Sequence, residues 1–154
     1  MADRQIFVMK LVLDTNVVID WLVFNAPFMN PLRESVRLKQ VTVLTHQPAV
    51  DELRRVLAYP ELKLDTARQV EVFARYEAET LLWPEDGALK VDMADLPKGF
   101  PHCRDPDDNH FLLLAYHARA AALVSRDNAV LKLKRRAARF GFEILTVPQL
   151  IERL

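Results

Sequence analysis

Carboxylate side chains occur at four places where the chain leaves an apolar run or enters a helix. Asp14 closes the apolar run Leu-Val-Leu, and Asp127 comes just after Ala-Leu-Val-Ser. Glu52 lies early in one helical pattern, and Asp108 lies at the start of another. Acids that converge repel one another unless a cation lies between them. Because hard divalent ions such as Mg²⁺ prefer oxygen ligands, these residues point to metal-assisted chemistry at a phosphate group.

Each acid also has a structural explanation, which the sequence alone leaves open. Asp is a favoured N-cap residue, and acids in the first turn of a helix are stabilised by the helix dipole. Asp105 and Asp127 would suit that role, and Glu52 could pair with an arginine on its own helix. Asp14 is harder to explain in this way, because a carboxylate at the end of an apolar strand is expected to be partly buried.

The elements that would position these acids alternate between strand and helix patterns. Apolar, β-branched runs predict strands at 9–13, 41–45, 122–125 and 142–147. Apolar periodicity and turn residues predict helices at 16–24, 31–39, 48–59, 65–82, 106–121, 128–139 and 148–154. Most of 84–104 is predicted to be loop, with a short strand near 88–91. The alternation predicts a parallel sheet with helices on both faces, whose ligand site lies beyond the carboxyl ends of the strands.

The composition is that of one globular domain over residues 1–154. Apolar residues make up 51% of the chain and charged residues 27%, which is enough for a hydrophobic core. The 21 basic and 21 acidic residues give no net charge, which argues against a chain that binds nucleic acid through a basic tail. Only three glycines occur, and they are too far apart for a Walker A or dinucleotide-binding loop. Any phosphate group must therefore be bound by something other than a glycine-rich loop.

One cysteine and the lack of long apolar segments bear on cellular location. Cys103 alone cannot form an intrachain disulfide or a cysteine-based zinc cluster, which fits a reducing compartment. The start Met-Ala-Asp-Arg-Gln lacks the pattern of a signal peptide, and charges interrupt the most apolar stretches. We therefore expect a cytoplasmic protein without a transmembrane span.

Five segments, in this order, resemble the PIN domain, and most closely the VapC-like toxins of bacterial toxin–antitoxin systems. They read Leu-Val-Leu-Asp-Thr-Asn-Val-Val-Ile, Glu-Leu-Arg-Arg-Val-Leu, Asp-Pro-Asp-Asp-Asn-His-Phe-Leu-Leu-Leu-Ala, Leu-Val-Ser-Arg-Asp and Ile-Leu-Thr-Val-Pro-Gln-Leu. The resemblance covers nearly the whole chain, from Lys10 to Leu154. It implies an α/β/α sandwich and a Mg²⁺- or Mn²⁺-dependent endoribonuclease that cleaves RNA through a metal-activated water. It also suggests a homodimer and a small antitoxin partner.

The resemblance assigns roles to individual residues. The acids expected to bind the metal and to act in catalysis are Asp14, Glu52, Asp108 and Asp127. The polar residues expected to support them are Asn16, Ser125 and, as a secondary candidate, Asp105. Two positions depart from the pattern: Arg126 replaces a common glycine, and Asn-Ala-Val-Leu follows Asp127 where relatives often carry a second Asp. These departures concern substrate geometry rather than the acid set.

Charge is balanced over the whole chain but not along it. Residues 119–139 contain seven bases and one acid, a net charge of +6, whereas residues 60–98 carry −4. Contacts to the phosphate backbone supply most sequence-independent affinity for nucleic acid. A basic segment that begins beside the acids suits an RNA backbone, although each base also fits an ordinary solvated surface. The residues expected to contact RNA are Arg126, Lys132 and Arg136.

The remaining polar and aromatic residues are expected to be structural. No two of the four histidines show the close spacing of a metal site, and His110 is expected on another side of the helix from Asp108. These histidines are His46, His102, His110 and His117. The large aromatic side chains are expected in the core or at an interface; they are Trp21, Phe24, Trp83 and Phe111. An ordinary packed helix is the simpler expectation for residues 65–82, although they could form a clamp arm over RNA or antitoxin.

Two alternative functions remain open on the sequence. A haloacid-dehalogenase-like phosphatase also places an Asp at a strand end against Mg²⁺, but it needs a second Asp where this chain has Asn16. A catalytically weak protein that binds RNA or an antitoxin through the same fold is the other alternative. Against it, all four acid positions are occupied.

Overall fold

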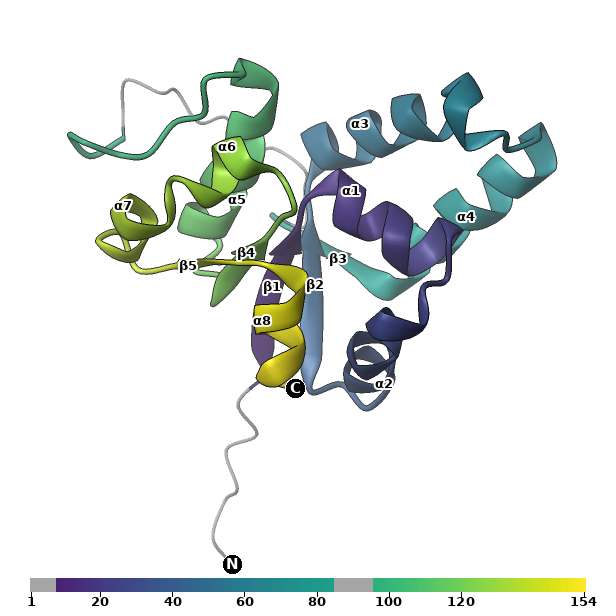
Figure 1. Cartoon of the computed structure of the whole chain (residues 1–154), viewed down its shortest axis with the longest axis horizontal. Coiled ribbons are helices and arrows are strands. Elements are labelled where there is room, and N and C mark those ends of the chain that lie inside the picture. The colour runs from purple at the N-terminus through teal and green to yellow at the C-terminus, as the bar shows by residue number, and fades with distance from the viewer. Residues whose placement is uncertain (1–7, 85–95) are drawn as a thin grey trace, which may run out of the picture.

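A five-stranded sheet lies between two layers of helices in the computed structural model, which describes residues 8–84 and 96–154 (Figure 1). The strands are β1 (Met9–Leu13), β2 (Val41–Thr45), β3 (Thr80–Leu82), β4 (Ala122–Val124) and β5 (Glu143–Leu145). Their order is β3-β2-β1-β4-β5, and all neighbouring pairs are parallel. This arrangement confirms the expected three-layer α/β/α sandwich with a central parallel sheet.

Helices cover both faces of the sheet (Figure 1). One face is covered by α1 (Thr15–Val18), α2 (Asn30–Arg37), α4 (Thr66–Glu79) and α8 (Val147–Glu152). The other face is covered by α5 (Asn109–His117), α6 (Asn128–Leu131) and α7 (Lys134–Ala138), while α3 (Gln47–Leu57) contributes to both cores. Within the described ranges, none of the helices combines the length and the apolar character that crossing a membrane requires.

The central strand β1 shows how the sequence produces these layers. Leu11 and Leu13 pack in the core on one side of the sheet, whereas Val12 packs in the core on the other. Successive side chains of a strand point to opposite faces, so a wholly apolar strand can be buried on both. β1 pairs with β2 on one side and with β4 on the other, and the strand order reverses between β1 and β4. In open α/β sheets, such a reversal opens a crevice beyond the carboxyl ends of the strands.

The predicted helix over 65–82 is wrong at its end. α4 stops at Glu79, and Thr80–Leu82 form the edge strand β3, in which Thr80 is aligned with Val43 and Leu82 with Thr45. Thr-Leu-Leu continues the apolar pattern of the helix, so periodicity alone does not separate the two elements. Pairing with β2 decides the conformation, because the open edge of β2 offers backbone hydrogen bonds to an extended segment.

Other boundaries also differ from the prediction. The helix over 16–24 is one α-helical turn followed by a π-helix at Ile19–Val23, and the helix over 128–139 divides into α6 and α7. The helix over 106–121 begins as a 3-10 turn at Pro106–Asp108 and ends at His117. The strand over 142–147 is confined to β5, because Val147 already belongs to α8. The strand expected near 88–91 falls outside the described residues.

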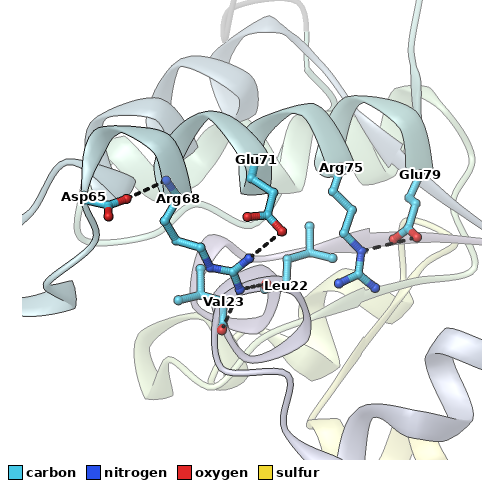
Figure 2. Close-up of polar contacts among 7 residues, drawn as sticks. All are labelled: Leu22, Val23, Asp65, Arg68, Glu71, Arg75 and Glu79. Atoms are coloured by element: carbon cyan, nitrogen blue, oxygen red, sulfur yellow. Dashed lines mark hydrogen bonds and ion pairs between the residues drawn. The ribbon is translucent and has the colours of Figure 1, made fainter.

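Polar contacts fasten α4 to the segment that follows α1 (Figure 2). The Asp65 side chain caps α4 by accepting a hydrogen bond from the Arg68 backbone N–H at 2.7 Å. The Arg68 guanidinium reaches the carbonyl oxygens of Leu22 and Val23 at 3.5 and 3.4 Å and pairs with Glu71 at 3.1 Å (Figure 2). α4 is therefore a packed helix, which agrees with the simpler expectation for this segment.

Candidate active site

The carboxyl edge of the sheet brings together the residues that follow β1 and β4. Asp14 comes directly after β1, and its Oδ2 accepts a hydrogen bond from Ser125 Oγ at 2.7 Å. Ser125 comes directly after β4 and is fully buried. The backbone N–H of Asp127 donates to the same Ser125 Oγ at 3.0 Å. Ser125 therefore links two of the predicted acids across the reversal in strand order.

Asp14 is a buried carboxyl group, with 5% of its surface exposed. Burial raises the pKa of Asp14, and the nearby charges of Glu52 and Asp127 raise it further. The hydrogen bond from Ser125 and the backbone amide of Asn16 act in the opposite direction. Asp14 thus lies among other negative charges and away from water, which is costly for a carboxylate without a cation.

Glu52 lies on α3 and is held by two neighbours. The Thr15 hydroxyl donates a hydrogen bond to Glu52 Oε2, and His110 Nε2 lies 3.6 Å from Glu52 Oε1. Burial raises the pKa of Glu52, but the contacts with His110 and Thr15 outweigh this effect, so the net pKa is lowered. Glu52 is therefore ionised at neutral pH.

Asp108 completes the set of four acids that we call the acid rim: Asp14, Glu52, Asp108 and Asp127. It lies at the end of the 3-10 turn that precedes α5. Burial raises the pKa of Asp108 to about 6, and the negative charges of the other rim acids and of Asp105 contribute to the rise. The four acids come from separate segments, and the fold places them within electrostatic range of one another.

Asp127 of the acid rim and the nearby Asp105 also cap helical turns, as their sequence positions suggested. Asp127 Oδ1 accepts a hydrogen bond from the Ala129 backbone N–H at 2.9 Å at the start of α6. Asp105 Oδ1 accepts from the Asp107 backbone N–H at 3.0 Å, and Asp105 is exposed. Capping and membership of a rim are compatible, because a carboxylate has about four lone-pair positions on its two oxygens.

The donor set suits a hard divalent cation. In the described part of the chain, no lysine or arginine forms an ion pair with Asp14, Asp108 or Asp127. Over residues 8–84 and 96–154, no three His, Cys, Asp or Glu side chains form a ready-made metal cluster. Mg²⁺ usually keeps several waters and takes only one or two carboxylates directly. Four acids that interact electrostatically without closing into a cage are compatible with that mode of binding.

The other predicted residues differ in how they lie at the rim. Asn16 has an exposed side chain, so its effect on Asp14 comes from its backbone amide. Arg126 is half-exposed, and its Nε lies 3.2 Å from Oδ2 of the buried Asp20. The Asp20 carboxylate therefore neutralises part of the charge of Arg126. Lys132 and Arg136 are exposed and form no ion pair within the described residues.

Two of the histidines that were expected to be structural, His46 and His110, lie next to Glu52 of the acid rim. His110 Nε2 lies 3.6 Å from Glu52 Oε1, and His110 Nδ1 lies 3.0 Å from His46 Nε2. Spacing in sequence could not reveal this pair, because 64 positions separate the two residues. Their positions relative to the strands and helices could have indicated it: His46 directly follows β2, and His110 lies in the first turn of α5. Both are at the edge of the sheet where the acids gather.

The pKa of Asp108 predicts how the stability of the metal-free protein depends on pH. A carboxyl group whose pKa is raised by folding holds its proton more tightly in the folded state, so its stabilising contribution is lost as pH rises. For Asp108, this contribution is lost as the pH rises from 3.8, the ordinary pKa, to about 6, the pKa in the folded protein. We expect the free energy of unfolding of the wild type to fall across this window relative to that of Asp108→Asn. Urea unfolding in EDTA at several pH values measures this, and parallel curves would contradict it.

Comparison with known protein families gives a match that covers most of the chain. A family model described as the PIN domain matches residues 10–129. The matched range includes all four acids of the rim and the elements from β1 to the start of α6. Neither the curated proteins nor the solved structures provide a significant match to the chain.

Proposed function

Because the chain belongs to the PIN domain family, a nuclease-type fold, we propose that it is a Mg²⁺- or Mn²⁺-dependent endoribonuclease. The observation that carries the proposal is the acid rim. Four acids from separate segments meet at the carboxyl edge of the sheet, where their charges help to raise the pKa of Asp108 to about 6. A phosphatase of the haloacid dehalogenase type is less well supported, because Asn16 replaces its second acid and turns its side chain to solvent.

The residues of the rim would have distinct tasks. A bound divalent ion supplies a water of lowered pKa and positive charge beside the scissile phosphate. Asp14, which accepts a hydrogen bond from Ser125, and Glu52, which accepts one from Thr15 and lies 3.6 Å from His110 Nε2, would provide negative oxygens for that ion. Asp127 and Asp108 would complete its surroundings. Fixed ligands favour catalysis, because no reorganisation is then needed as charge develops on the phosphate.

The proposed reaction is tested by incubating the protein with single-stranded RNA and with DNA of the same sequence. We expect Mg²⁺ or Mn²⁺ to support internal cleavage of the RNA, and the DNA to remain intact. Since water is the proposed nucleophile, the products should carry no 2′,3′-cyclic phosphate. Cyclic ends, or cleavage at full rate without a divalent ion, would contradict the proposal.

RNA is proposed to lie along the basic segment that begins at Arg126. Lys132 and Arg136 are the better candidates for binding phosphate, because Asp20 already pairs with Arg126. We expect Lys132→Ala combined with Arg136→Ala to weaken RNA binding. The slope of log affinity against log salt should become shallower by about 0.7 for each phosphate that the variant no longer neutralises.

Fluorescence anisotropy with labelled RNA at several salt concentrations measures this effect. A control combines Arg37→Ala with Lys39→Ala, since Arg37, which pairs with Glu34, ends α2 and Lys39 follows it, so both lie before the amino end of β2 and are exposed. This control should keep the affinity and the salt slope of the wild type. An equal effect of the two double variants would show that net charge matters and the position does not.

The finer features of the resemblance are also proposals. We propose that the protein is the VapC-like toxin of a toxin–antitoxin pair, that it forms a homodimer and that it acts in the cytoplasm. A short reading frame directly upstream, whose product copurifies with this chain and inhibits cleavage, would support the toxin assignment. Metal binding without any turnover would instead favour a catalytically weak protein that binds RNA or an antitoxin.

A further inference from the structure

Two histidines form a chain of contacts that ends at Glu52. His46 Nε2 lies 3.0 Å from His110 Nδ1, and His110 Nε2 lies 3.6 Å from Glu52 Oε1. His46 is 4% exposed and directly follows β2, whereas His110 lies in the first turn of α5. The contacts therefore connect the end of β2 and the start of α5 to one carboxylate of the acid rim.

The chemistry of the three groups fixes the direction of the hydrogen bonds. A carboxylate oxygen of Glu52 can only accept, so a hydrogen bond between Glu52 Oε1 and His110 Nε2 requires the proton of His110 to be on Nε2. With the ring proton of His110 on Nε2 alone, its Nδ1 is an acceptor, and the Nε2 of His46 has to be the donor. Burial lowers the pKa of His46 to about 3, so His46 is a neutral ring with one donor and one acceptor.

The His110 Nε2 atom is buried and has no hydrogen-bond partner within 3.5 Å in the described structure. Buried donors without a partner are rare and call for an explanation. The Glu52 carboxylate at 3.6 Å is only slightly too far away, and such contacts in active sites often tighten when a ligand binds. On the other side of the carboxylate, Thr15 already holds Oε2.

On the premise of the proposed function, we propose that His46 and His110 are positioning residues for Glu52. His46 fixes the tautomer of His110, and the Nε2–H of His110 holds Oε1 while Thr15 holds Oε2. Each oxygen keeps a second lone pair for a divalent cation. Donors that orient a metal-binding carboxylate typically change metal affinity or activity by about 10- to 100-fold when they are removed.

The tautomers provide a test that needs no metal. In a two-dimensional ¹⁵N–¹H NMR spectrum of imidazole groups at pH 8, we expect both His46 and His110 to carry their proton on Nε2. Single His→Gln variants assign the signals. A proton on Nδ1 of either residue would overturn the proposed chain, because His46 could then not donate to His110 or His110 could not donate to Glu52.

Metal affinity provides the second test. We expect His110→Phe to bind Mn²⁺ about tenfold or more weakly than the wild type in calorimetric titrations. His110→Gln should recover most of the affinity, because its amide nitrogen can replace Nε2–H as a donor. The matched control is His117→Phe, which makes the same replacement at the other end of α5. It should bind Mn²⁺ like the wild type.

The outcomes separate this inference from the proposed function. If the wild type binds Mn²⁺ and His110→Phe binds it equally well, the positioning role is wrong and the metal-dependent function stands. If the wild type binds no Mn²⁺, the proposed function and the role of the pair toward a cation both fail, while the tautomers still decide whether the chain exists. Should His110→Phe not fold, the tautomers of the wild type still decide the question, because a proton on Nδ1 of either ring would contradict the proposed chain.

Discussion

Asp14→Asn is expected to lower the rate of RNA cleavage by at least about 100-fold and to leave the fold intact. The substitution removes the charge that would hold a cation at the most buried position of the acid rim. The amide has nearly the same shape as the carboxylate, and its oxygen can still accept the hydrogen bond from Ser125. Single-turnover cleavage of a labelled RNA measures the loss.

The same variant should be at least as stable as the wild type in the absence of metal. Burial and the charges of Glu52 and Asp127 raise the pKa of Asp14, so the ionised group opposes folding at neutral pH. Thermal unfolding in EDTA measures the difference. Asp51→Asn is the control for the loss of one negative charge. Asp51 lies on α3, next to Glu52, but it is not a member of the acid rim, and it accepts a hydrogen bond from Gln47. Loss of activity together with a clear fall in Tm would indicate a structural role for Asp14.

The second large effect is expected from the divalent ion itself. EDTA should abolish cleavage, and added Mg²⁺ or Mn²⁺ should restore it. A ligand that binds only the folded state at 100 times its Kd stabilises that state by about 2.7 kcal/mol. For a domain of this size, that corresponds to a rise in Tm of about 5–10 °C. Part of the rise comes from relief of the repulsion that raises the pKa of Asp108.

Differential scanning calorimetry with and without Mn²⁺ measures this shift. NaCl at matched ionic strength controls for general screening of charge, which should contribute much less at the partly buried rim. Asp14→Asn should lose most of the Mn²⁺-dependent rise. An equal rise in the variant and the wild type would place the cation elsewhere in the protein, and cleavage that persists in EDTA would end the metal-dependent proposal.

The expected effects of Asp14→Asn and of the divalent ion both follow from how charges are distributed in a chain with no net charge. Acids gather at the carboxyl edge of the sheet, and the exposed bases Lys132 and Arg136 follow β4. The scarcity of glycine removes the nucleotide-binding loops that hold phosphate through backbone amides. The proposed alternative is a cation held by carboxylates, which would relieve the repulsion that helps to raise the pKa of Asp108.

The fold was largely predictable because local patterns agree with it. Strand β1 is apolar throughout its buried part, as expected for a strand that both layers cover, and Met9–Leu13 has the predicted limits. Strand β3 was not predicted, because Thr80–Leu82 differ from the preceding helix only in their pairing with β2. Pairing between segments 37 positions apart, such as Val43 and Thr80, is a tertiary property that no local window contains.

The sequence by itself determined which acids end strands or begin helices, and the alternation of elements placed them at one edge of a parallel sheet. Only the tertiary structure decided their surroundings. It brought Ser125 to Asp14, His110 and His46 to Glu52, and Asp20 to Arg126. Those contacts set the burial and the pKa of each group, because desolvation and Coulomb interactions depend on distance in space and not on separation along the chain.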